Sequence, residues 1–251
     1  NNPLGESEIK TILSNNKVAV VFFPESAVGD INRNMLHKNI VAYYDYERDG
    51  FYSFTDDKET DDFDVIMLLS SLYYDLQFPS AIKEKYKDYR IIYIGNFLEK
   101  SDNAYLCDYD KYKASEMTVL ERPVIAIAGV CSGLNKSDVQ IDLLSRLKKD
   151  GLDIKAISNN PVGLLYDMEV FNYPTELKFP DVVYSINKCM YLTEVNENMD
   201  AWLINIGGAI GQVNNLNTYN FGKLADAYLS ATNIDVAIMC VNAFVDVLNL
   251  K

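Results

Sequence analysis

The stretch that decides the expected fold is PVIAIAGVCSGLNKSDVQ, residues 123–140. Residues 123–128 form a short apolar run without helical period, bounded by proline and glycine, which predicts a buried parallel strand. A loop with two glycines follows at residues 129–135. From Lys136 the apolar residues recur at helical spacing, and Gly151 is a typical helix stop. Strand, glycine loop, Lys-Ser and helix is the order of a phosphate-binding loop, in which backbone N–H groups and a helix N-terminus face an anion.

This loop departs from the phosphate-loop consensus G-x-x-x-x-G-K-[ST]. Asn135 stands where glycine is expected before Lys136, and the loop is one residue too long. Asparagine tolerates a left-handed backbone better than most residues do, so we expect the turn to be kept. Two interpretations stay open: a binding loop, and a plain turn between strand and helix whose glycines serve only the chain reversal.

Composition and charge narrow the classes of protein and partner. The chain has 251 residues, of which 49% are hydrophobic and 24% charged, as in a globular protein of one large or two modest domains. The net charge of −13 argues against nucleic acid and anionic membranes as partners. No apolar run approaches the roughly 20 residues of a membrane span.

Cysteine usage predicts the compartment. The four cysteines are far apart and the chain has a single histidine, so no local zinc or iron–sulfur motif is present. Residues 1–10 show no secretory pattern. We therefore expect reduced cysteines, no bound transition metal and a cytoplasmic location. The cysteines are Cys107, Cys131, Cys189 and Cys240.

Strand and helix patterns alternate on both sides of a polar, tyrosine-rich stretch. This alternation predicts an α/β protein with two parallel-sheet domains. We place the first domain at residues 1–100, a connection at 101–121 and the second domain at 122–251.

Three polar or glycine-rich loops follow predicted strands in the second domain, at residues 129–137, 158–163 and 207–215. Ligands of open parallel sheets bind beyond the carboxyl ends of the strands, so we expect these loops to gather into one site. Gly207 and Gly208 would let the backbone approach a phosphate closely. Asn205 would point at this site only if the pleat allows it. The alternative is that such turns are routinely rich in glycine, asparagine and proline.

One further motif is set aside. Residues 187–190, Asn-Lys-Cys-Met, are similar to the guanine-recognition motif N-K-x-D, but Met190 replaces the aspartate and the segment has helical spacing.

Three stretches together resemble a known family. They are GVCSGLNKSDVQ at residues 129–140, SNNPVGLLY at 158–166 and DAWLINIGGAIGQVNN at 200–215. They resemble the clostridial peptide maturation system proteins, which are encoded in gene clusters for ribosomally made, post-translationally modified peptides, often beside radical SAM maturases. The resemblance implies an accessory role in the maturation of such a peptide. It also implies a Rossmann-like first domain and a second domain like that of P-loop NTPases.

The resemblance and the loop chemistry together define the expected site. Its cofactor-binding residues are Gly129, Ser132, Gly133, Asn135, Lys136, Ser137, Gly207 and Gly208. The expected cofactor is ATP or GTP with magnesium, and the expected partner is a precursor peptide or a partner maturation enzyme.

Three functions stay open, and no catalytic residue is assigned. The first is an accessory protein that binds a nucleotide or phosphate ligand through the degenerate loop. The second is a non-catalytic scaffold for the peptide or the maturase. The third is an ATP- or GTP-dependent ligase or kinase-like enzyme that uses Lys136 and magnesium.

Overall fold

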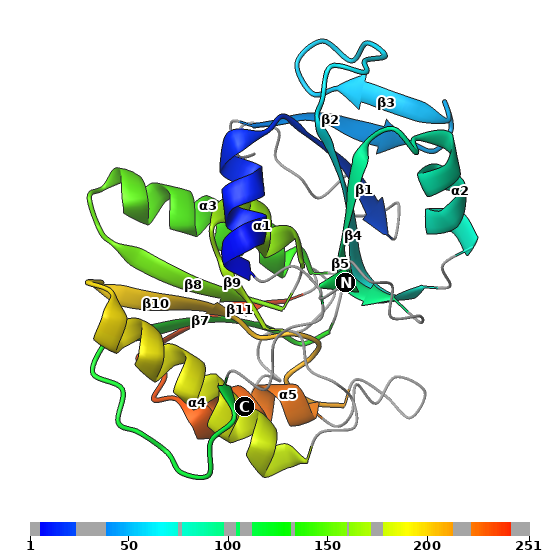
Figure 1. Cartoon of the computed structure of the whole chain (residues 1–251). Coiled ribbons are helices and arrows are strands. Elements are labelled where there is room, and N and C mark those ends of the chain that lie inside the picture. The colour runs from blue at the N-terminus through cyan, green and yellow to red at the C-terminus, as the bar shows by residue number, and fades with distance from the viewer. Residues whose placement is uncertain are drawn as a thin grey trace. The chain divides into compact units, whose positions relative to one another are not determined.

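The computed structural model describes residues 6–23, 39–74, 77–97, 104–105, 112–131, 134–159, 161–171, 178–212 and 222–241 (Figure 1). The chain is an α/β protein with two mostly parallel sheets, as the sequence predicted. It divides into two compact units. Unit 1 comprises Asn1–Asp108 and Asn160–Asn172, and unit 2 comprises Tyr109–Asn159 and Tyr173–Lys251.

The units differ from the expected domains in one segment. The first division falls after Asp108, within the stretch expected to be the connection. Asn160–Asn172, expected in the second domain, groups with unit 1 instead. Its elements are the 3₁₀ helix η4 (Pro161–Tyr166) and the strand β9 (Glu169–Val170). Leu164 and Leu165 are buried in the core of unit 1, and the apolar pattern of a segment does not tell which core it will join.

Unit 1 is built on a six-stranded sheet with the order β3-β2-β1-β4-β5-β6. All its strand pairs are parallel except β2 with β3, which form an antiparallel hairpin. The order matches the doubly wound dinucleotide-binding folds, with β3 reversed. The strands are β1 (Val18–Phe23), β2 (Ile40–Asp45), β3 (Gly50–Ser53), β4 (Val65–Tyr74), β5 (Arg90–Phe97) and β6 (Ala104–Tyr105).

Both faces of this sheet are covered. Val18, Val20 and Phe22 of β1 lie in the core that includes helix α1 (Glu6–Asn15). Ala19 and Val21 lie in the core on the other face, which includes Ile82 of helix α2 (Gln77–Lys85). Burial on both faces explains why β1 is a continuous apolar run rather than an alternating one.

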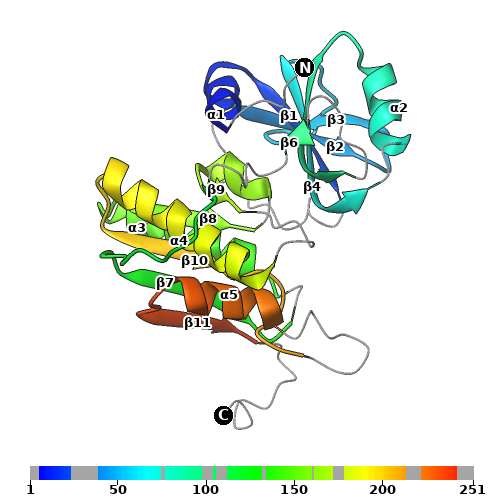
Figure 2. The same ribbon diagram turned by 60° about the horizontal axis from the view of Figure 1, so that its bottom comes forward.

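Unit 2 has the strand order β11-β7-β10-β8, and these strands are all parallel. Helix α3 packs on β7, β8 and β10. Helices α4 and α5 pack on each other, on the opposite face of the sheet from α3 (Figures 1 and 2). The elements are β7 (Val124–Gly129), α3 (Lys136–Lys149), β8 (Ile154–Ser158), α4 (Phe179–Asn196), β10 (Ala201–Asn205), α5 (Lys223–Ala231) and β11 (Val236–Cys240).

The end of α3 confirms the predicted glycine stop. Gly151 has a φ of 89°, and its N–H donates to the carbonyl oxygen of Lys148 at 3.1 Å. The N–H of Leu152 reaches back to the carbonyl of Leu147 at 3.1 Å. A left-handed glycine with these paired bonds satisfies the last carbonyls of the helix.

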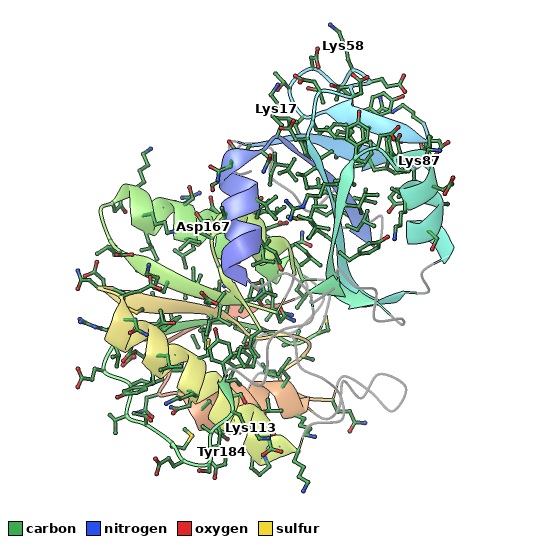
Figure 3. The ribbon with its side chains drawn as sticks, viewed as in Figure 1. Lys17, Lys58, Lys87, Lys113, Asp167 and Tyr184 are labelled. Carbon is green, nitrogen blue, oxygen red and sulfur yellow. The ribbon has the colours of Figure 1, made fainter. Side chains whose placement is uncertain are left out.

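Charged side chains such as Lys58 and Lys113 lie outside the packed layers (Figure 3). None of the described helices is both long enough and apolar enough to cross a membrane.

Candidate anion-binding site at the start of helix α3

The candidate site lies at the carboxyl ends of the neighbouring strands β7 and β10, where the segments that follow them lead to helices on opposite faces of the sheet. Strands β7 and β10 pair directly, and Asn205 at the end of β10 lies beside Ile127. The chain leaves β7 for α3 on one face of the sheet and leaves β10 for α5 on the other face (Figure 1). Open α/β sheets bind their ligands beyond the carboxyl ends of the strands at such a divergence.

Asn135 makes the turn into α3. Its φ of 51° and ψ of 32° are left-handed, which confirms that asparagine takes the conformation expected of glycine here. Its carbonyl accepts the N–H of Val139 at 3.1 Å, while its side chain caps no N–H of the helix. The Asn135 side chain thus provides no cap, and the helix dipole places partial positive charge at this end of α3.

Lys136 carries the positive charge of the site. Its side chain is only 8% exposed. The ammonium donates to the carbonyl oxygens of Gly208 at 2.7 Å and Cys131 at 3.2 Å. Burial lowers the pKa of Lys136, and the nearby thiols of Cys240 and Cys131 oppose that shift.

The ammonium of Lys136 pairs with no carboxylate in the part of the chain that the structure describes. Gly129 gives room to its aliphatic stem, since a Cβ at Gly129 would lie 3.1 Å from Lys136 Cδ. Gly208, whose carbonyl accepts the shorter of the two hydrogen bonds from Lys136, has a left-handed φ of 71°. Within the described part of the chain, the charge is thus held by neutral dipoles alone.

Asn205 reaches the first turn of α3. Its Nδ2 donates to Ser137 Oγ at 3.3 Å, so the pleat does turn this side chain toward the site. The residue is 1% exposed, and its Oδ1 finds no hydrogen-bond partner among the described residues. A buried acceptor without a donor is costly, so this oxygen marks a place where a donor is missing.

The described parts of the three expected loops do meet. The N–H of Ile210 donates to the carbonyl of Gly129 at 3.0 Å. A Cβ at Gly207 would lie 2.1 Å from Asn159 Nδ2 and 2.9 Å from Leu224 Cδ2. Gly207 therefore serves close packing against protein atoms, whereas it was expected to serve close approach to a phosphate. Ser132, Gly133 and residues 213–215 lie outside the described residues.

Gln140 of the loop-and-helix stretch has a structural role. Its side chain is 1% exposed, and Nε2 donates to the carbonyls of Ile157 at 2.9 Å and Leu203 at 3.1 Å. It thereby ties α3 to β8 and β10 and holds the start of the helix over the sheet.

Asn187 begins the segment 187–190, which is similar to the guanine-recognition motif, and its side chain also has a structural role. Within α4, its Nδ2 donates to the carbonyls of Thr118 at 2.9 Å and Ala231 at 3.0 Å. Its Oδ1 accepts the N–H of Thr118 at 2.7 Å. The amide is fully used by the backbone, so it is not aimed at a base.

The described residues offer few ligands for the expected magnesium ion at this site. Ser137 Oγ and Asn205 Oδ1 are neutral oxygens of a kind that magnesium accepts, and the ion usually takes further oxygens from the phosphates it accompanies. The described residues include no cluster of three or more His, Cys, Asp or Glu that would hold a metal ion. Cys131, Cys189 and Cys240 form no disulfide among the described residues, and Cys107 lies outside them.

No protein-family model matches this chain, and no curated protein matches it. The resemblance to clostridial peptide maturation proteins therefore stays a prediction.

Proposed function

We propose that unit 2 binds a phosphate-bearing ligand, a nucleotide or a simpler phosphate, beyond the carboxyl ends of β7 and β10 at the start of α3. The observation that carries this proposal is the buried ammonium of Lys136, which is balanced only by backbone carbonyls in the described structure.

The energetic argument rests on charge. Burying a cation without a counter-charge is unfavourable, and the lowered pKa of Lys136 has that same cause. An anion at this position offsets this cost, because it faces both the ammonium and the positive end of the α3 dipole. Phosphate suits the position better than a carboxylate since its several oxygens accept from Lys136, Ser137 and the helix N–H groups together.

The buried Asn205 adds a second, independent indication of a ligand. Its Oδ1 needs a donor, and its Nδ2 already orients the hydroxyl of Ser137. A hydroxyl of the ligand, a protonated phosphate oxygen or a water held by the ligand supplies that donor.

Within this proposal ATP or GTP with magnesium is the nucleotide to test first. The proposal is one of binding, and it assigns no general base and no nucleophile. The wider role, accessory to peptide maturation with a precursor peptide or a maturation enzyme as partner, rests on the resemblance alone.

The test is calorimetric titration of the wild type and Lys136→Met with inorganic phosphate, ATP and GTP, each with and without magnesium. Methionine keeps the length of the stem and removes the charge. We expect at least tenfold weaker binding in the variant, about 1.4 kcal/mol. Lys149→Met, at the exposed far end of the same helix, is the matched control and should bind as the wild type does.

Two outcomes contradict the proposal. One is equal affinity in the wild type and Lys136→Met, which places the ligand elsewhere. The other is no binding of any of the three probes by the wild type, which leaves the loop as a structural turn. Thermal unfolding of both variants shows whether a loss of binding reflects a loss of fold.

A further inference from the structure

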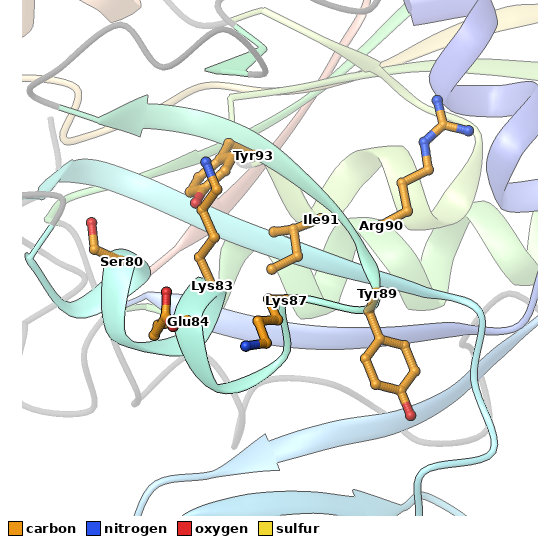
Figure 4. Close-up of a pocket in the computed structure, with 8 residues that line it drawn as sticks. All are labelled: Ser80, Lys83, Glu84, Lys87, Tyr89, Arg90, Ile91 and Tyr93. Atoms are coloured by element: carbon orange, nitrogen blue, oxygen red, sulfur yellow. The ribbon is translucent and has the colours of Figure 1, made fainter.

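Unit 1 contains a hollow that is separate from the candidate site of unit 2. It has a volume of about 580 Å³ and lies between α2 and β5 (Figure 4). Its walls include Ser80, Lys83, Glu84 and Lys87 from α2 and the turn after it. This volume is in the range of sites that hold small molecules.

The floor of the hollow is apolar. Ile91 and Tyr93 are two residues apart on β5, so their side chains project to the same face of the sheet, where they join the core that includes Ile82. They are 9% and 3% exposed. The neighbouring strand β6 is only two residues long and pairs with Tyr93 and Ile94, which leaves Ile91 beyond its reach.

Arg90 borders the hollow but does not direct its charge into it. Its side chain alternates to the other face of β5, and Figure 4 shows its guanidinium directed away from Lys83 and Tyr93. The positive charge of the hollow therefore comes from Lys83 and Lys87.

These two lysines are four residues apart, on one side of α2 and the turn after it. Neither lysine pairs with a carboxylate in the described residues, whereas Lys85 between them pairs with Asp49 at 2.9 Å. Glu84 is the one carboxylate among the described residues that line the hollow. A net positive hollow on a chain of net charge −13 is a local exception that an anion would complement.

We infer that this hollow binds a small anionic molecule with a flat apolar body. The body lies against Ile91 and Tyr93, and the anionic group lies between the ammonium groups of Lys83 and Lys87. This inference does not depend on the phosphate site of unit 2.

The probe for the test is 1-anilinonaphthalene-8-sulfonate, which joins an aromatic body to one negative charge. Its fluorescence is titrated with the wild type, Lys83→Gln, Lys87→Gln and the double variant. We expect about three- to tenfold weaker binding in each single variant and a larger loss in the double variant. Lys85→Gln removes the same charge from the same helix and is the control, with a change of less than twofold.

A second probe separates the contribution of the probe's charge from that of its hydrophobic body. N-phenyl-1-naphthylamine has a similar aromatic body without the sulfonate, and its affinity should be the same in all these variants. Lys136→Met should leave the affinity for the sulfonate probe unchanged. The proposals for the two sites are therefore tested independently. Equal affinity for the sulfonate probe in the wild type and the double variant overturns the inference, as does absence of saturable binding by the wild type.

Discussion

The ammonium of Lys136 donates a 2.7 Å hydrogen bond to the carbonyl oxygen of Gly208, 72 residues later in the chain. One side chain thereby joins the loop after β7 to the loop after β10. Any anion that draws the ammonium toward itself competes with Gly208 for it. Under the proposed function, the loop after β10 is thus coupled to the anion that Lys136 would bind.

The buried ammonium predicts how stability depends on pH. Burial lowers the pKa of Lys136 below its ordinary 10.5, so the folded state binds fewer protons here than the unfolded state. Stability contributed by this group therefore rises with pH, from the lowered pKa up to about 10.5. Urea unfolding of the wild type and Lys136→Met should show a difference in unfolding free energy that shifts in favour of the wild type across this window.

The comparison with Lys136→Met cancels the tyrosines and other lysines that titrate nearby in pH. Saturating phosphate should flatten the pH dependence, because a bound anion raises the pKa of the ammonium. A difference that stays constant from neutral pH to the alkaline end would contradict the predicted effect of burial.

Gly207→Ala should destabilise unit 2. The new Cβ would lie 2.1 Å from Asn159 Nδ2 and 2.9 Å from Leu224 Cδ2, so at least two neighbours must move. Overpacking of this kind costs about 1–3 kcal/mol, measurable by urea unfolding. Gly211→Ala is the matched control, with no atom within 4 Å of its Cβ position, and it should change stability by less than about 0.5 kcal/mol. Asn159→Ala should recover part of the loss, and equal stabilities of the two glycine variants would refute the packing argument.

Two left-handed glycines separate backbone strain from steric contact. Gly151 and Gly222 have φ angles of 89° and 76°. A Cβ at Gly151 meets nothing within 4 Å, whereas one at Gly222 lies 2.5 Å from the carbonyl oxygen of Ile210. Gly151→Ala should cost only the strain, about 1–2 kcal/mol. Gly222→Ala should cost this and about 1–3 kcal/mol more in denaturant unfolding, so a similar loss in both variants would count against the contact.

Asn187→Leu should be among the most destabilising single changes in α4. It leaves the N–H and carbonyl of Thr118 and the carbonyl of Ala231 without the side chain that now pairs with them. The bond to Ala231 is buried and the two bonds to Thr118 are half-buried. An unsatisfied buried group costs about 1–3 kcal/mol, so we expect a total of at least about 2 kcal/mol in urea unfolding. The control is Asn196→Leu at the exposed end of the same helix, which should be nearly neutral. Similar effects of both changes would show that the Thr118 contacts carry little stability.

The sequence by itself determined the strand, turn and helix from β7 through α3. This order depends on neighbours along the chain: an apolar strand run, an asparagine able to take φ of 51°, a helical apolar spacing and a glycine stop at Gly151. It also identified Lys136 and Ser137 as residues of the first turn of a helix.

Only the tertiary structure decided what these residues meet. The pairing of Lys136 with Gly208, the reach of Asn205 to Ser137 and the close packing of Gly207 on Asn159 all follow from β10 lying beside β7. The membership of Asn160–Asn172 in unit 1 and the hollow beside β5 likewise depend on which surfaces come together. Local patterns record interactions between residues a few positions apart, whereas strand order and core membership are set by the summed packing of distant segments, to which no single local pattern corresponds.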